Sequence, residues 1–106
     1  MKKILNDPKK AAEEAMEGIV LSQPQILARI PGRRIVTRKS CPVIGKVGLI
    51  CGGGSGHEPA HSGYVGRGML DAAVMGDVFT SPAPGDIITA IEAVNGKAGV
   101  LLIIWN

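Results

Sequence analysis

Aromatic residues are almost absent from this chain of 106 residues, which has one tyrosine, one phenylalanine and one tryptophan. Its core must therefore be aliphatic. The only cysteines, Cys41 and Cys51, are too few for a disulfide framework or a cysteine-rich zinc site, so we expect buried free thiols. No stretch approaches the roughly 20 apolar residues of a membrane span, and the basic start lacks the apolar segment of a signal peptide. These absences predict a cytoplasmic protein without a membrane partner.

A concentrated positive charge is also lacking, although the net charge is +3. The basic residues come in short pairs without accompanying aromatic residues: Lys2-Lys3, Lys9-Lys10, Arg33-Arg34 and Arg38-Lys39. They alternate with acidic residues, as on a solvated surface, whereas nucleic-acid binding usually shows a basic stripe with a recognisable motif. We expect no nucleic-acid partner. The 45% apolar and 20% charged residues are typical of one globular domain, which we place at residues 1–106.

The spacing of apolar residues predicts an α/β fold of βαβ layers, with a mainly parallel sheet covered by helices and an N-terminal helix. Asp7-Pro8 starts that helix and Ser22-Gln-Pro24 ends it. A short turn is expected at 24–30. A second helix carries Ile87 to Val94 and stops at Asn95-Gly96. The expected strands are a weak one at a sheet edge, 34–37, and three buried ones, 46–51, 69–74 and 99–104.

Residues 52–59 read Gly-Gly-Gly-Ser-Gly-His-Glu-Pro and directly follow the strand expected at 46–51. Without Cβ atoms, such a backbone can take positive φ and approach a ligand closely. Ligands of parallel sheets lie beyond the carboxyl ends of the strands. The loop around Thr80-Ser81 leaves from the same predicted edge, so the sequence predicts a site between the two loops.

Two familiar chemistries do not suit the glycine loop. A phosphate-binding P-loop requires a lysine where His57 stands, and the dinucleotide fingerprint requires a glycine there. The run His57 to His61 matches the zincin pattern His-Glu-x-x-His, which needs both histidines on one helix face. Pro59 lies between them and fits only as the first residue of a helix, which leaves His57 outside it. We therefore predict neither a nucleotide nor a metal in this loop.

A neutral polar ligand suits the loop better. The backbone N–H groups of Gly53, Gly54 and Ser55 can donate to hydroxyl or carbonyl oxygens, and His57 can donate or accept near neutral pH. A purely structural alternative remains on these residues alone: a tight connection after the strand, with a hydrogen-bonded histidine.

Several motifs of the chain occur together: 52–61, Gly63-Tyr-Val-Gly66, Gly68-Met-Leu70 and Phe79-Thr-Ser-Pro82, with the opening Met-Lys-Lys-Ile-Leu-Asn-Asp-Pro and 99–104. By these motifs the chain resembles dihydroxyacetone kinase, and more closely the start of the dihydroxyacetone-binding subunit of the bacterial, phosphotransferase-system-linked enzyme. The resemblance implies a glycerone kinase of glycerol metabolism that presents a hydroxyl of dihydroxyacetone for phosphorylation. The phosphoryl donor, or ADP/ATP, is held by a partner subunit, so this chain binds no cofactor itself. The family also implies a homodimer.

The resemblance also implies roles for individual residues that match the family's motifs. The Gly54 N–H and Ser81 contact the substrate, and His57 hydrogen-bonds a hydroxyl and assists catalysis. The family continues after its last strand with Lys-Asn-Tyr-Thr-Gly-Asp, whereas Trp105 stands at the lysine position here and the sequence ends at Asn106. We expect an N-terminal part of the binding subunit that is inactive alone, or alternatively a non-catalytic paralogue that acts as an interaction or regulatory module. The apolar strand at 99–105 predicts an oligomer, most simply a two-fold dimer.

Overall fold

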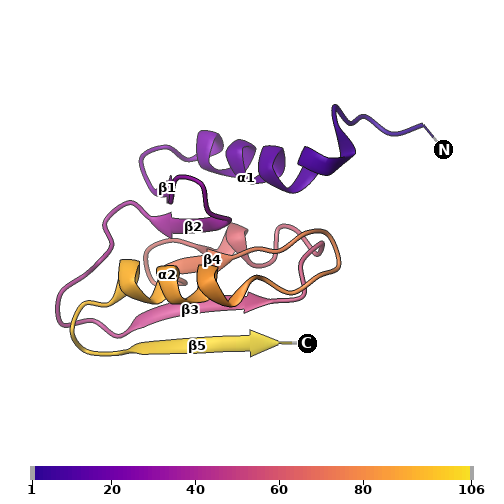
Figure 1. Cartoon of the computed structure of the whole chain (residues 1–106). Coiled ribbons are helices and arrows are strands. Elements are labelled where there is room, and N and C mark those ends of the chain that lie inside the picture. Colours follow the sequence, from indigo (N-terminus) through magenta and orange to yellow (C-terminus); the bar gives the residue numbers. More distant parts are fainter. Residues whose placement is uncertain (1, 106) are drawn as a thin grey trace.

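The computed structural model describes residues 2–105, except for the side chain of Trp105. The predictions on Asn106 and on the Trp105 side chain lie outside the described part. The elements in chain order are the 3₁₀ turn η1 (Pro8–Lys10), α1 (Ala11–Ser22), β1 (Leu27–Arg29), β2 (Ile35–Arg38), β3 (Gly48–Gly53), the 3₁₀ turn η2 (Ser62–Tyr64), β4 (Ala72–Val74), α2 (Pro84–Val94) and β5 (Val100–Trp105) (Figure 1).

These strands form a single mixed sheet in the order β1-β2-β4-β3-β5. β3, β4 and β5 run parallel, whereas β2 pairs antiparallel with both β1 and β4. Gly52 lies opposite Val74 on one side and Ile104 on the other, so the three parallel strands end at one edge of the sheet. The predicted α/β fold with an N-terminal helix is confirmed, and so is the shared edge from which the glycine loop leaves.

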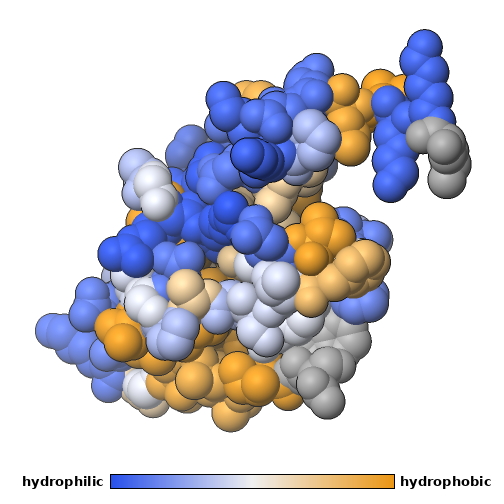
Figure 2. Space-filling model, turned by 45° about the vertical axis from the view of Figure 1, so that its right-hand side comes forward, coloured by the Kyte–Doolittle hydropathy of each residue, from blue (hydrophilic) through white to orange (hydrophobic). Residues whose placement is uncertain are grey.

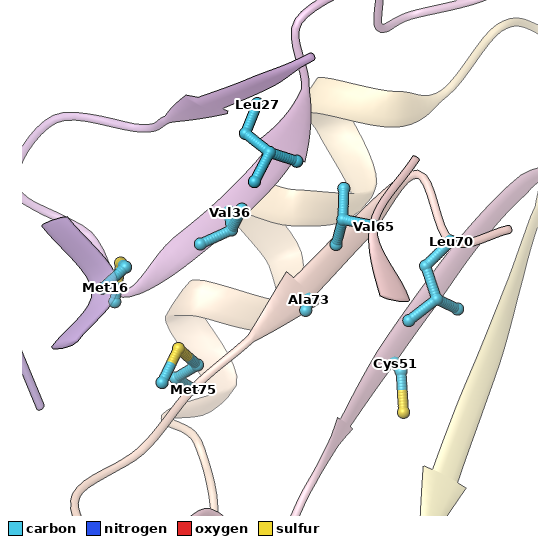
Figure 3. Packing of buried hydrophobic residues seen from close by; sticks show 8 residues of the cluster. All are labelled: Met16, Leu27, Val36, Cys51, Val65, Leu70, Ala73 and Met75. Carbon is cyan, nitrogen blue, oxygen red and sulfur yellow. The ribbon is translucent and has the colours of Figure 1, made fainter. Parts of the chain in front are cut away.

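Helices cover the two faces of the sheet because its central strands are apolar on both sides. α1 packs against β1 and the turn η2, and α2 packs against β2, β3 and β4 (Figure 1). The cluster beneath α1 is Met16, Leu27, Val36, Cys51, Val65, Leu70, Ala73 and Met75 (Figure 3). The cluster beneath α2 is Ile35, Ile50, Ala72, Val74, Ala90 and Val94. Neighbouring residues of β2, β3 and β4 enter opposite clusters, as the two-residue period of a strand requires.

Three details of the predicted arrangement are wrong. The strand at 34–37 is not at an edge, because β1 pairs on its outer side. β1 itself lies within the segment 24–30, which we had expected to be only a turn. No helix begins at Pro59, and the connection from β3 to β4 has only the 3₁₀ turn η2. That connection instead folds back on itself through the isolated bridge between Val65 and Leu70.

The helix ends follow the sequence signals, except that Asp7-Pro8 starts the 3₁₀ turn η1 and α1 begins only at Ala11. Asp7 accepts a hydrogen bond from the Lys9 N–H at 2.9 Å, which caps the start of η1 before α1. α2 ends at Val94, directly before Asn95-Gly96. Gly96 is needed there for close approach, because a Cβ at this position would lie 1.9 Å from the carbonyl oxygen of Val43. The glycine therefore lets a loop pass against the helix end.

Asp71 forms a buried ionic cluster before β4, away from the glycine loop. Its side chain, 2% exposed, accepts hydrogen bonds from Arg38 at 2.9 Å and from the Leu49 N–H at 2.8 Å, and it also pairs with Lys46. Burial alone would raise the pKa of Asp71, but the bonds from Lys46, Leu49 and Arg38 outweigh it and hold that pKa below its ordinary value. The cluster ties β2, β3 and the start of β4 together.

The prediction of a buried strand at 99–104 is wrong, because the strand β5 leaves a row of apolar side chains in solvent. Leu101, Leu102, Ile103 and Ile104 are each between 39% and 64% exposed. Figure 2 shows apolar surface gathered along this side of the molecule. An apolar edge strand of this kind is a surface on which another chain segment can pair.

Candidate functional site

A cleft of about 670 Å³ opens where the parallel strands end. It is lined by Gly52, Gly53, Ser81, Pro82, Pro84, Ile87, Ile88 and Ile104. Two of the predicted site residues, Gly53 and Ser81, therefore meet in one cleft. The polar contribution comes from the two loops, while α2 and β5 supply an apolar wall.

Ser55 joins the glycine loop to the loop that follows β4. Its N–H donates to the Thr80 carbonyl at 3.0 Å, and its carbonyl accepts from the Phe79 N–H at 2.8 Å. Its buried hydroxyl accepts from the Gly76 N–H at 2.7 Å. The Ser55 N–H, which the sequence offered as a donor to a ligand, is thus engaged within the protein, and Gly53 and Gly54 are the remaining predicted backbone donors.

Glycines allow the two loops and α2 to approach closely. A Cβ at Gly76 would lie 2.6 Å from the carbonyl oxygen of Ser81, and one at Gly52 would lie 2.9 Å from the Ile87 side chain. Gly56 has a φ of +98°, a backbone conformation that suits glycine, and a Cβ there would lie 3.1 Å from the Phe79 ring. These glycines therefore allow the walls of the site to pack closely against each other.

The structure does not bring every predicted residue into the cleft. Gly54 instead lines a very small space beneath the glycine loop, together with Ser55 and His61. His57 is exposed and is not among the residues that line the cleft. Its imidazole forms an edge-to-face contact with Phe79, with ring centroids 6.1 Å apart and planes at 66°. Sequence reasoning named Phe79 only as part of the motif Phe79-Thr-Ser-Pro82 and gave it no place in the site, because its contact with His57 joins segments far apart in the chain.

Ion pairs brace the loop that carries Ser81. Arg34 pairs with Asp77 in that loop and, at 3.2 Å, with Glu13 on α1. The bond to Asp77 is the main reason why the pKa of Arg34 lies above its ordinary value. The bond from Arg29 is the main reason why the pKa of Glu13 lies below its own. Through Arg34, which bonds to both Asp77 and Glu13, the loop that carries Ser81 is held against α1.

The two cysteines are free and form no metal-binding arrangement in the described part of the chain. Burial raises the pKa of the Cys51 thiol, which keeps it protonated and unreactive. Cys41 is also free, half-buried, and its pKa is raised by burial and by Asp71. Within residues 2–105, no three His, Cys, Asp or Glu side chains gather as metal ligands. In the same part of the chain, no helix combines the length and apolarity needed to cross a membrane.

Comparison with known proteins identifies relatives along the whole chain. The chain is 56% identical to the dihydroxyacetone-binding subunit DhaK of PTS-dependent dihydroxyacetone kinase 1 from Listeria innocua, covering 100% of this chain and 32% of that protein. It is 48% identical to the corresponding subunit of the PEP-dependent enzyme of Escherichia coli, covering 100% and 30%. The chain thus spans about a third of the length of these curated relatives.

Solved structures and a family model agree with these relatives. The native dihydroxyacetone kinase of C. freundii superposes with a TM-score of 0.89 at 44% identity, covering 99% of this chain and 20% of that one. The dihydroxyacetone kinase operon co-activator Dha-DhaQ superposes with a TM-score of 0.69 at 35% identity, covering 87% and 36%. The model of the Dak1 domain matches residues 17–106. On this match, and on its similarity to DhaK subunits, the chain belongs to the Dak1 domain family.

Proposed function

We propose that the chain is the N-terminal part of a dihydroxyacetone-binding subunit of a dihydroxyacetone kinase, also called glycerone kinase, and contributes half of its substrate site. One observation carries the proposal: Gly53 and Ser81, from segments far apart in the sequence, line the same cleft at the carboxyl ends of the parallel strands. Sheets of this kind bind their ligands there. The names of the relatives supply the ligand, dihydroxyacetone.

In this proposal each residue of the site has a separate role. Gly53 and Gly54 supply backbone N–H groups for the oxygens of dihydroxyacetone, and the exposed Ser81 hydroxyl supplies a further polar contact. His57 hydrogen-bonds the hydroxyl that is to be phosphorylated and assists catalysis. Ser55 holds the two loops together. Without a charge, such contacts give weak binding of a small polyol.

The phosphoryl group comes from a partner subunit in this proposal. The glycine loop has His57 at the position where a P-loop has its lysine, so this chain offers no such cradle for a nucleotide. The relatives are named as PTS-dependent and PEP-dependent enzymes, in which a separate subunit binds dihydroxyacetone. We therefore infer a cytoplasmic protein of glycerol metabolism that works with a nucleotide-binding kinase subunit.

Titration of dihydroxyacetone into the ¹⁵N-labelled chain tests the site. We expect amide shifts at Gly53, Gly54, His57 and Ser81, with a dissociation constant in the millimolar range, about −4 kcal/mol of binding free energy. Glycerol, which lacks the carbonyl, is the matched control ligand. Shifts confined to other parts of the sheet would contradict the assignment.

Catalysis should require more than this chain. We expect no turnover from the chain alone or with partner subunits, because the aspartate that the family has after its last strand is not among these residues, and a missing general base costs roughly 10²–10⁴ in rate. A coupled assay for dihydroxyacetone phosphate measures this. Robust product formation would mean that the roles carried over from the family are wrong.

The exposed face of β5 supports a proposal about assembly. In the described part of the chain, β5 has a sheet neighbour only on its β3 side, and Leu101 to Ile104 are exposed, so we infer a two-fold dimer through β5. Sedimentation at micromolar concentration should show a dimer, and Ile103→Lys should dissociate or unfold it. A clean 11 kDa monomer with sharp thermal unfolding would contradict the dimer.

A second function is favoured by one comparison. The co-activator Dha-DhaQ shares this fold at 35% identity, so the fold also serves a protein named as an operon co-activator. A regulatory module would keep the scaffold without needing the substrate contacts. Substitution of Ser81 separates the two functions: Ser81→Ala should abolish the dihydroxyacetone-dependent shifts only if the cleft binds that ligand.

A further inference from the structure

Phe79 lies in the loop between β4 and α2, the loop that carries Ser81, and its backbone conformation is unfavourable for its residue type. Its φ is +62°, in the left-handed region, and its side chain is 77% exposed. Within residues 2–105, Lys97 is the only other non-glycine residue with a positive φ. A bulky residue in this region is strained, and such strain persists where neighbouring contacts impose it, often at functional sites.

Contacts from the glycine loop impose this conformation. The Phe79 N–H donates to Ser55 at 2.8 Å, and the next residue, Thr80, accepts from Ser55 and donates to Asp77 at 2.9 Å. The Phe79 ring also lies against the backbone of Gly56, where a Cβ would be only 3.1 Å from it. The backbone is therefore fixed on both sides of Phe79, while the ring itself contributes little to the core.

What the exposed ring contacts is the imidazole of His57. The rings meet edge to face, with centroids 6.1 Å apart, the arrangement that aromatic pairs favour. We propose that Phe79 is a positioning residue, whose ring holds the His57 imidazole in one orientation. The inference deepens the proposed function, since it rests on His57 acting on dihydroxyacetone.

The chain contains a matched control for this contact. His61 meets Tyr64 with ring centroids 5.8 Å apart and planes at 63°, almost the same geometry. Tyr64 lies in η2, outside the loop that carries Ser81. Loss of an aromatic neighbour can therefore be compared at two histidines of the same protein, only one of which is assigned to the substrate.

The first measurement follows the imidazole carbon–hydrogen resonances of both histidines in the full chain. Phe79→Leu should move the His57 resonances and leave those of His61 in place, and Tyr64→Leu should do the reverse. Phe79→Tyr keeps the ring and should restore the wild-type His57 resonances. Unchanged His57 resonances in Phe79→Leu would overturn the inference, whether or not the chain binds dihydroxyacetone.

The second measurement is the affinity for dihydroxyacetone. Phe79→Leu should weaken it by about two- to twelvefold, the range that corresponds to one edge-to-face pair, whereas Tyr64→Leu should leave it unchanged. If the wild-type chain binds and Phe79→Leu binds equally well, Phe79 does not position His57 for the ligand. If the wild-type chain does not bind at all, the proposed function fails, and the resonances alone decide the inference about His57.

Thermal unfolding separates positioning from a merely structural role. Glycine adopts a φ of +62° without strain, so Phe79→Gly should melt at no lower temperature than the wild type while weakening binding as Phe79→Leu does. If stability and affinity both fall in Phe79→Gly, the ring serves the fold, and the positioning role is refuted.

Discussion

Asp71→Asn tests how the ionic cluster before β4 stabilises the fold. The substitution keeps the size of the side chain but removes the charge that faces Arg38 and Lys46. The new amide NH₂ must also face a hydrogen-bond donor, since Arg38, Lys46 and the Leu49 N–H all donate to the carboxylate. The variant therefore has a buried mismatch in place of a satisfied cluster.

The magnitude follows from the burial of the partners. Removing one member of a buried ion pair costs about 3–5 kcal/mol. The Arg38 side chain is 13% exposed, but that of Lys46 is 34% exposed and water can solvate it in the variant. We therefore expect a loss of about 3 kcal/mol in the free energy of unfolding. With an m-value of about 1.5 kcal/mol/M, the urea midpoint falls by about 2 M.

Asp77→Asn is the matched control, because Asp77 also pairs with an arginine but its side chain is 67% exposed. An exposed pair contributes about 0–1 kcal/mol, so this variant should unfold close to the wild type. Equal losses in the two variants, or a loss below about 1 kcal/mol in Asp71→Asn, would refute the argument from burial.

Asp71→Asn also predicts a pH dependence of stability with a definite sign. The pKa of Asp71 is lowered in the folded protein, whereas an unfolded aspartate titrates near pH 3.9. Its contribution to stability is therefore complete above about pH 4 and is lost as the pH falls through the folded pKa. On acidification below about pH 4, the Asp71→Asn variant should lose less stability than the wild type does, as measured by urea unfolding.

Three further substitutions test the packing of the fold and of the site. Gly96→Ala should destabilise by about 3 kcal/mol or more in urea unfolding, because the new methyl would lie 1.9 Å from a backbone carbonyl oxygen; a stable variant would mean that the loop can move aside. Gly76→Ala should displace Ser81 and weaken dihydroxyacetone binding about tenfold, or about 1.4 kcal/mol; unchanged affinity would exclude Ser81 from the contact. Met16→Ala should cost about 2–5 kcal/mol, because Met16 is fully buried, whereas Leu21→Ala, on an exposed side chain of the same helix, should cost about 0.5 kcal/mol or less.

The parallel half of the sheet was predictable because two of its strands are nearly continuous apolar runs. The runs at 46–51 and 99–104 have little alternation, and the structure places β3 and β5 there with a slightly different start and end. β1 gave no comparable signal, since Leu27–Arg29 is three residues long and is held by its pairing with β2. A strand of that length depends on its partner, which local sequence does not reveal.

The candidate site was predictable only in outline. The glycine run and the position of Ser81 after a strand placed both at one sheet edge, where they line a common cleft. The engagement of the Ser55 N–H and the left-handed backbone of Phe79 could not be read from the residues, because each depends on the other loop. Pro59 likewise suggested a helix start, but the chain there turns into η2.

The strand order β1-β2-β4-β3-β5 also has a consequence for how the chain folds as it is synthesised. The hairpin of β1 and β2 closes over a short distance along the chain, and local pairings of this kind form quickly. β3 lies between β4 and β5, and both of these strands come after it in the chain. The backbone of β3 therefore forms its sheet hydrogen bonds only after the later segments are in place. The strand that leads into the glycine loop is therefore ordered late, and in pulsed hydrogen exchange its amides should gain protection after those of the hairpin.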